Sequence, residues 1–243
     1  MIDVAFTRAE IRPAEVAVVI DVLRASSSVV QALEGGYERV LCCDSIERAE
    51  QLRGPGRVLA GERDCVPPPG FDLGNSPSGF ARPRGREVVL ATTNGAPTLV
   101  AAAAAAERVV VAAMSNLQAV VALVSCADVQ LVCAGTDGRP GLDDTYVAGR
   151  IAELLEGDRT DGTLMAQSLV ARYASPLAAL EASQAARNLR AVDLESDIED
   201  CAQDSVFGVV PTVTSVGDGM VEVGRGDGAK QSLPSMPVAQ HLA

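Results

Sequence analysis

The segment Val16–Gly36, VAVVIDVLRASSSVVQALEGG, decides the fold class of this chain. Its first five residues, Val16–Ile20, form a wholly apolar run, which predicts a strand that is buried on both faces. Residues Ser26–Leu33 then predict a helix, which Gly35–Gly36 end. A buried strand that passes through a short polar turn into a helix is typical of an α/β protein.

The same alternation continues outward from this segment. Further strands are predicted at Arg39–Cys43, Val58–Ala60, Glu87–Ala91, Arg108–Ala113 and Val129–Ala134, with helices at Ile46–Leu52, Ala96–Ala106 and Leu117–Val124. The second half is predicted to contain helices at Asp143–Leu155, Leu164–Tyr173, Pro176–Leu189 and Ile198–Gln203, and strands at Val206–Val213 and Met220–Val223. We therefore expect an α/β fold of three layers, with a largely parallel or mixed sheet flanked by helices and a helix-rich C-terminal half.

The length of 243 residues suits one α/β unit. This unit could divide into two lobes, at about 1–135 and 136–225. The polar segment 224–243 is spaced by glycine and proline, which predicts a flexible tail.

Charge and hydropathy narrow the range of partners. The formal net charge of −12 argues against nucleic acid, because binding to phosphates needs clustered Lys and Arg. No apolar run reaches the roughly 18 residues of a membrane span, and Met1–Glu10 lacks the apolar stretch of a signal peptide. We therefore expect a cytoplasmic protein with no membrane partner. An anionic substrate would be repelled unless an arginine or a divalent cation reverses the local sign.

Histidine and cysteine usage exclude further classes of site. The only histidine, His241, lies within the last three residues, so Ser-His-Asp hydrolases, histidine phosphatases and His-rich zinc sites are not expected. The six cysteines include no CxxC pair and no zinc spacing, which favours buried free thiols.

Four polar segments follow predicted strands, which is where open α/β sheets bind ligands. In the first, Asp21 offers a carboxylate, Arg24 a guanidinium, and Ser26–Ser27 a helix N-terminus that favours anions. A plain turn and helix cap would use the same residue types. The second segment, Thr92–Gly95, places hydroxyls, an amide and a glycine before a helix, and fits an anion cradle or a capped helix equally well.

The third segment is Cys133–Asp144, CAGTDGRPGLDD. Cys133 and Arg139 have the C-x5-R spacing of cysteine phosphatases, which would make the thiol a nucleophile. However, Pro140 stands where that loop should run into a helix, and no histidine precedes the cysteine. We favour Asp144 as a metal ligand over Cys133 as a nucleophile.

The fourth segment is the long loop Gly61–Phe80, GERDCVPPPGFDLGNSPSGF. The run Pro67–Pro69 disfavours both helix and strand, and a loop of this length usually lines a site. Glu62 follows its predicted strand as Asp21 and Asp144 follow theirs. Three carboxylates at three strand ends form a suitable set of oxygen ligands for Mg²⁺.

Taken together, these segments resemble the 2-phosphosulfolactate phosphatase family of coenzyme M biosynthesis. The matching stretches run in family order from about Val18 to Pro211: VVIDVLRASSSVVQAL, AGERDCVPPPGFDLGNSPSGF, ATTNGAPTL, VCAGTDGRPGLDDTYVAG and DIEDCAQDSVFGVVP. The resemblance implies an α/β, Mg²⁺-dependent acid phosphatase that cleaves (R)-2-phospho-3-sulfolactate to 3-sulfolactate and phosphate. The sequence departs from the family at Asp64–Cys65, where glycines are commoner.

From the residues and the resemblance we expect catalytic roles for Asp21, Arg24, Glu62 and Asp144, and Mg²⁺ held by Asp21, Glu62 and Asp144. Contacts with a small anionic phosphorylated substrate are expected from Ser26, Ser27, Arg63, Asn75, Ser76, Thr93, Asn94, Gly95 and Ser183. Direct attack by water is favoured, since the D-x-D-x-T pattern of phosphoaspartyl enzymes is absent at Asp21. The resemblance and the alanine-rich helix faces favour a homodimer. Two alternatives remain: a non-catalytic small-anion-binding α/β protein, and a cysteine phosphatase that uses Cys133 and Arg139.

Overall fold

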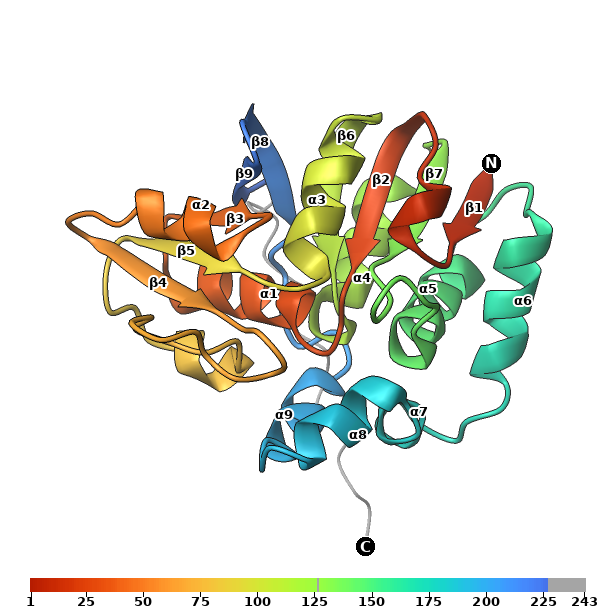
Figure 1. Ribbon diagram of the computed structural model, residues 1–243. Coiled ribbons are helices and arrows are strands. Elements are labelled where there is room, and N and C mark those ends of the chain that lie inside the picture. The colour runs from red at the N-terminus through yellow and green to blue at the C-terminus, as the bar shows by residue number, and fades with distance from the viewer. Residues whose placement is uncertain (126, 227–243) are drawn as a thin grey trace, which may run out of the picture.

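The computed structural model describes residues 1–125 and 127–226, and within them nine strands form one mixed sheet flanked by helices (Figure 1). The strands are β1 (Ile2–Ala5), β2 (Ala14–Ile20), β3 (Arg39–Cys43), β4 (Arg57–Gly61), β5 (Glu87–Ala91), β6 (Ala106–Ala112), β7 (Val129–Cys133), β8 (Pro211–Gly217) and β9 (Met220–Arg225). The α-helices are α1 (Ala25–Gly35), α2 (Ile46–Gln51), α3 (Gly95–Ala103), α4 (Leu117–Val124), α5 (Leu142–Leu154), α6 (Asp161–Val170), α7 (Pro176–Glu181), α8 (Gln184–Arg190) and α9 (Ser196–Cys201). Short 3-10 helices are η1 (Arg8–Glu10), η2 (Pro77–Phe80) and η3 (Met114–Asn116).

The sheet consists of two parallel groups joined by an antiparallel hairpin. Its strand order is β1-β7-β2-β6-β8-β9-β3-β5-β4. Strands β1, β7, β2 and β6 run parallel, as do β3, β5 and β4, whereas the hairpin β8–β9 pairs antiparallel with β6 on one side and β3 on the other. Strands β8 and β9, the last two among the described residues, therefore lie between two groups formed by the first half of the chain, and the expected mixed α/β sheet is confirmed.

Strand β2 shows why the sequence forms three layers. Its side chains alternate between the two faces of the sheet, and both faces are covered by helices. Val18 belongs to the hydrophobic cluster that contains Leu117 of α4 and residues of α5. Val19 belongs to the cluster on the other face, with Leu33 of α1 and residues of α3. The apolar run that predicted a strand buried on both faces is thus explained.

Several predicted element boundaries were wrong. Strand β1 was missed, since its four residues include the polar Asp3 and give little periodicity. The single helix expected over Pro176–Leu189 is two helices, because Ser183 ends one and caps the next by accepting from the amide of Ala186. Residues before Pro211 are not strand: the amides of Ser205 and Phe207 donate to carbonyls of η3 instead of a neighbouring strand.

Other differences concern the loop and the tail. The loop Gly61–Phe80 was expected to lack secondary structure, yet it begins with the last residue of β4 and ends in η2, where Pro77 occupies the first turn. Gly224 and Arg225, assigned to the tail, belong to β9. Residues 227–243 of the expected tail, which include His241, lie outside the described residues, as does Cys126. No helix in the described part of the chain is long and apolar enough to cross a membrane.

Candidate active site

A cavity of about 100 Å³ opens beyond the carboxyl ends of β2, β4, β5 and β7. The β2 arrow in Figure 1 points toward this region, and helices α7–α9 lie beyond its tip. The lining residues are Asp21, Leu23, Arg24, Glu62, Asp64, Cys65, Asn75, Thr93, Asn94, Gly135, Thr136, Asp137, Asp143, Asp144, Ala185 and Asn188. Six of them are carboxylates and one, Arg24, is a cation, so the pocket is strongly acidic. The cavity brings together side chains from all four polar segments. Two of these segments follow β2 and β7 and two follow β4 and β5, although the two parallel groups run in opposite directions across the hairpin β8–β9.

Backbone amides hold three of these carboxylates in place. Asp21 accepts from the amide of Ala25 in the first turn of α1 (3.1 Å). Glu62 spans two segments, since its Oε2 accepts from Cys65 N (3.1 Å) and its Oε1 from Thr93 N (2.7 Å). A carboxylate oxygen that accepts one hydrogen bond keeps a further lone pair for a ligand. These carboxylates are therefore fixed in position while still able to bind.

Asp144 joins the ends of β2 and β7. Its Oδ1 accepts from Val22 N and its Oδ2 from Gly135 N, both at 2.9 Å. The preceding residue, Asp143, is also buried and lines the pocket from the first turn of α5. The Asp143–Asp144 pair stands at a helix N-terminus, where the helix dipole favours negative charge.

The pKa values of Asp21, Asp143 and Asp144 are raised. Burial, followed by the charges of Glu62 and Asp143, raises the pKa of Asp21 to about 7. Burial likewise raises the pKa of Asp143 to about 6. The pKa of Asp144 lies well above its usual range, because the group is buried close to Asp143 and Asp21. The pocket therefore favours either protonated carboxyl groups or a compensating cation near neutral pH.

The pocket's arginine is itself ion-paired. Arg24 Nη1 lies 2.6 Å from Asp197 Oδ2, and the two side chains are only 2% and 3% exposed. The same guanidinium donates to Ser76 Oγ (3.1 Å) and to the carbonyl of Cys65 (2.7 Å), and Ser76 donates to Asp197 (2.7 Å). These contacts use three of the five N–H donors of Arg24. The pair ties the end of β2 to the loop after β4 and to α9, and leaves two donors for a ligand.

Two polar atoms at the pocket have no partner among the described residues. Asn75 Oδ1 belongs to a side chain that is 3% exposed, and Thr93 Oγ1 is buried at the end of β5. Buried polar atoms in native proteins are almost always hydrogen-bonded, so such an exception needs an explanation. Since both residues line the cavity, a bound ligand or its water would complete their hydrogen bonds.

Some expected substrate contacts lie behind the pocket wall. Ser26 Oγ accepts from Asp21 N, and Ser27 Oγ donates to the carbonyl of Val22, so both hydroxyls shape the turn after β2. Gly95 allows close packing: a Cβ on it would lie 2.6 Å from Asp21 Oδ2. Asn94, Thr93 and Asn75 line the cavity, whereas Arg63, Ser76 and Ser183 do not. The Ser183 hydroxyl caps α8.

The thiol of Cys133 is poorly placed to act as a nucleophile. It is fully buried at the end of β7 and is not a lining residue of the pocket. Burial and the charges of Asp144 and Asp143 raise its pKa well above the usual range, which disfavours the thiolate. Arg139 lies on the exposed turn that follows. The C-x5-R spacing is therefore not part of a cysteine phosphatase loop here.

The acidic residues fit a hydrated cation. No group of three His, Cys, Asp or Glu side chains among the described residues is arranged to hold a metal ion by itself. Mg²⁺ commonly uses only one or two protein carboxylates and keeps several waters. Asp21, Glu62 and Asp144 offer anchored oxygens in a buried, anionic pocket. The donor set therefore fits Mg²⁺ whose coordination is completed by water or substrate oxygens.

Strand ends with buried carboxylates, a buried arginine and unpartnered polar atoms define a site for a small, polar, anionic ligand. Comparison with known proteins narrows this class. The family model described as 2-phosphosulpholactate phosphatase matches residues 5–215, and the chain belongs to this family. It is thereby assigned to the phosphoric monoester hydrolases.

Three relatives, each named "Probable 2-phosphosulfolactate phosphatase", illustrate the match. That of Thermus thermophilus is 38% identical over 217 residues, covering 85% of this chain and 92% of the relative. That of Deinococcus radiodurans is 42% identical over 211 residues (82% and 88%), and that of Thermotoga petrophila 37% over 220 residues (88% and 96%). The resemblance drawn from the sequence is therefore confirmed over most of the chain.

Sequence reasoning missed two residues that line the pocket, Asp143 and Asn188, and a third, Asp197, that pairs with the lining residue Arg24. Asp143 was passed over for its neighbour, although both carboxylates begin the same helix. Asp197 lies in the DIED stretch that carried part of the resemblance, but nothing in the sequence indicated its pairing with Arg24. Asn188 sits on α8 within an ordinary amphipathic pattern and is identified only by its place in the cavity.

Proposed function

We propose that this chain is a Mg²⁺-dependent phosphatase that hydrolyses (R)-2-phospho-3-sulfolactate to 3-sulfolactate and phosphate. The observation that carries the proposal is the strand-end pocket, whose six carboxylates and single guanidinium suit a cation together with an anionic ligand. Relatives named for this activity support the choice of substrate. The reaction would supply sulfolactate to coenzyme M biosynthesis in organisms that carry out that pathway.

Asp21, Glu62 and Asp144 would hold the Mg²⁺ ion. In such a site the chemistry that Mg²⁺ supplies is neutralisation of phosphoryl charge and activation of water. Their backbone hydrogen bonds fix the carboxylates before substrate arrives, so little reorganisation is needed on binding.

Arg24 would bind the phosphoryl group, and Asp143 would transfer a proton to the leaving group. The two unused N–H groups of Arg24 would donate to phosphoryl oxygens, and the unpartnered Oδ1 of Asn75 would accept a hydrogen bond from a water molecule in the site. As water bonds to phosphorus and the ester P–O bond breaks, Asp143 would donate a proton to the leaving alkoxide and regain one from the water. Its pKa of about 6 suits a general acid below neutral pH.

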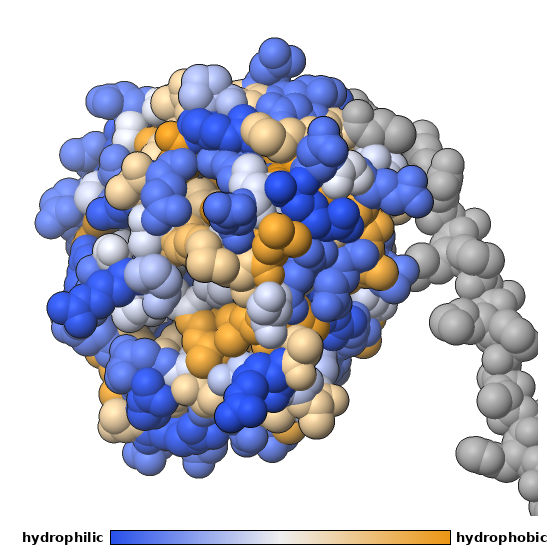
Figure 2. Space-filling model, turned by 90° about the vertical axis from the view of Figure 1, so that its right-hand side faces the viewer, coloured by the Kyte–Doolittle hydropathy of each residue, from blue (hydrophilic) through white to orange (hydrophobic). Residues whose placement is uncertain are grey.

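A homodimer and a cytoplasmic location complete the proposal. Of the large exposed hydrophobic side chains, Leu154, Leu164 and Met165 belong to α5 and α6. The side of the molecule that carries these helices shows orange areas interrupted by hydrophilic residues (Figure 2). Such a mixed surface suits a modest interface, and sedimentation of the purified protein would determine its oligomeric state.

Phosphate release from (R)-2-phospho-3-sulfolactate tests the proposal directly. We expect turnover with Mg²⁺, loss of turnover with EDTA, and recovery on adding Mg²⁺. Asp143→Asn is expected to lower kcat by 100-fold or more, a size typical of losing a general acid. Binding of phosphosulfolactate without turnover would favour the alternative, a non-catalytic anion-binding protein.

A further inference from the structure

We propose that Asn188 is a specificity-determining residue of this site, whose Nδ2 donates a hydrogen bond to the second anionic group of the phosphorylated substrate. Helix α8 contributes two lining residues to the cavity, Ala185 and Asn188. Helix α8 belongs to the group of helices that lies beyond the tip of β2 (Figure 1). The inference deepens the proposed function and rests on it.

A chain of hydrogen bonds along α8 fixes the orientation of this amide. Arg187 donates to Gln184 Oε1 from both Nε (3.1 Å) and Nη2 (2.9 Å). Since arginine has no acceptor, Gln184 must turn its oxygen toward Arg187 and its Nε2 away. That Nε2 donates to Asn188 Oδ1 at 2.8 Å. Asn188 is therefore held with its oxygen on the helix surface and its Nδ2 free.

The hydrogen-bond chain Arg187–Gln184–Asn188, called here the relay, is anchored at Arg187. Arg187 Nη1 donates to the carbonyl of Ala182, at the break between α7 and α8 (2.9 Å). The guanidinium is thus fixed at three N–H groups, and the direction of every bond in the chain follows from which groups can only donate. No described residue accepts from Asn188 Nδ2, and Asn188 lines the cavity with its oxygen already bonded to Gln184, so Nδ2 is the group that it can offer to a ligand there.

A neutral donor at this position suits a second anionic group. The one cation that lines the pocket, Arg24, already uses three N–H groups on Asp197, Ser76 and Cys65. The carboxylates that would hold the cation lie at the strand ends, so the phosphoryl group belongs there. The remainder of the substrate then extends toward α8, where an amide can bind a sulfonate or carboxylate without attracting the acidic residues of the pocket.

The direct test replaces the donor with an isosteric acceptor. Asn188→Asp is expected to raise KM for phosphosulfolactate by roughly 10–100-fold, as expected for losing a hydrogen bond to a charged group. For 4-nitrophenyl phosphate, which has no second anionic group, KM should change by less than about threefold. Equal changes for both substrates would overturn the inference, because they would reflect a general effect of charge or folding.

The relay is tested without touching the pocket. Gln184→Glu keeps an oxygen for Arg187 but offers a second oxygen to Asn188, which must then turn its Nδ2 away from the cavity. We expect KM for phosphosulfolactate to rise about tenfold. The matched control is Gln51→Glu on α2, another exposed helical glutamine that accepts from an arginine three residues away, and it should leave KM unchanged. A Gln184→Glu effect that persists in an Asn188→Ala background would show plain electrostatics and would contradict the relay.

Calorimetry with 3-sulfolactate separates this inference from the proposed function. Asn188→Asp should weaken its binding at least tenfold, whether or not the protein turns over a phosphate ester. A protein that hydrolyses no phosphate monoester would refute the proposed function, while such a loss of binding would still support Asn188. Unchanged sulfolactate affinity in the variant would overturn the role of Asn188 even in an active phosphatase.

Discussion

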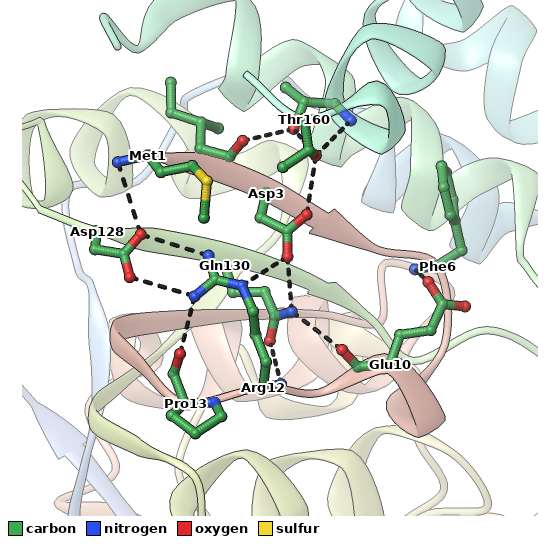
Figure 3. A network of polar contacts seen from close by, with 11 residues as sticks. Met1, Asp3, Phe6, Glu10, Arg12, Pro13, Asp128, Gln130 and Thr160 are labelled. Atoms are coloured by element: carbon green, nitrogen blue, oxygen red, sulfur yellow. Dashed lines mark hydrogen bonds and ion pairs between the residues drawn. The ribbon is translucent and has the colours of Figure 1, made fainter. Parts of the chain in front are cut away.

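The parallel strands β1, β7, β2 and β6 hold carboxylates in opposite ways at their two ends, called here the amino-terminal edge and the carboxyl edge. At the amino-terminal edge, Arg12 bridges Asp3 (2.9 Å) and Asp128 (3.3 Å), and Gln130 donates to Asp3 (Figure 3). At the carboxyl edge, Asp21, Asp143 and Asp144 form no ion pair with any described residue. One edge satisfies its charges within the chain, and the other leaves them for a ligand.

The pKa directions express this difference. Burial alone would raise the pKa of Asp3, but hydrogen bonds from Gln130, Arg12 and Thr160 outweigh it and lower the pKa. A hydrogen bond from Arg12 lowers the pKa of Asp128. The pKa values of Asp21 and Asp143 at the pocket are raised, because burial outweighs their hydrogen bonds with backbone amides. Shifted pKa values in a cleft are typical of functional sites, whereas paired charges are typical of structural ones.

The largest effect on activity should come from removing the charge of Asp21, at the carboxyl edge. Asp21→Asn is expected to lower kcat/KM at least 1000-fold, about 4 kcal/mol of transition-state stabilisation, because the metal loses a ligand. The same variant should raise the free energy of unfolding of the metal-free protein at pH 8, since a buried unpaired charge is removed. Kinetics and urea unfolding measure the two changes.

Asp3→Asn is the matched control for that variant. It should leave kcat/KM within about twofold and lower the free energy of unfolding by about 1 kcal/mol, since it weakens the contacts of Asp3 with Arg12. The contrast between the edges fails if both variants shift stability in the same direction.

A second prediction concerns the one buried ion pair at the pocket edge. Asp197→Ala would leave Arg24 buried without its partner, which should cost about 3 kcal/mol of stability. Urea unfolding of the variant measures this loss. A double replacement, Asp197→Leu with Arg24→Met, should recover most of the stability but no activity. Full stability in the single variant would show that water or Ser76 can replace the carboxylate.

The third prediction is the pH dependence of stability in EDTA. The folded state keeps Asp21 and Asp143 protonated up to about pH 7 and 6, whereas the unfolded chain releases these protons near 3.8. Stability should therefore fall as pH rises from about 4 to 7. Asp3 and Asp128 have lowered pKa values, so their contribution is lost as pH falls below about 4.

Urea titrations at several pH values measure this profile. The decline above pH 4 should flatten in Asp21→Asn and in saturating Mg²⁺. A stability that rises steadily to pH 8 in EDTA would contradict the assignment of uncompensated charges to the pocket.

The sequence predicted the pocket edge better than the opposite edge. Hydrophobic runs predict where each strand ends, so Asp21, Glu62 and Thr93 could each be placed after a strand from spacing alone. That the ends of two oppositely directed groups meet at one cavity depends on the hairpin β8–β9, which no local pattern indicates. The network of Arg12 depends on β1 pairing with β7, a contact across more than 120 residues that no local pattern encodes. Likewise, the burial of Arg24 against Asp197 depends on where α9 packs, 173 residues later.

The smallest predicted effect concerns the positive φ of Cys65, which lies in a turn beside the pocket. Two hairpin turns line the cavity mouth, with Asp64–Cys65 and Asp137–Gly138 at their tips, all at positive φ. In such turns the second position favours glycine, which Gly138 provides and Cys65, at φ 67°, does not. Cys65→Gly should therefore be more stable than Cys65→Ala by about 0.5–1 kcal/mol.

The alanine variant isolates the conformational part of this effect. Cys65 packs against the hydrophobic core with a half-buried thiol, so both replacements lose the same side-chain contact and only glycine relieves the positive φ. Equal unfolding midpoints in urea for the two variants would mean that the turn carries no strain. Because Cys65 N donates to Glu62 and its carbonyl accepts from Arg24, kcat/KM in both variants then reports whether relaxing the backbone moves the groups that it positions.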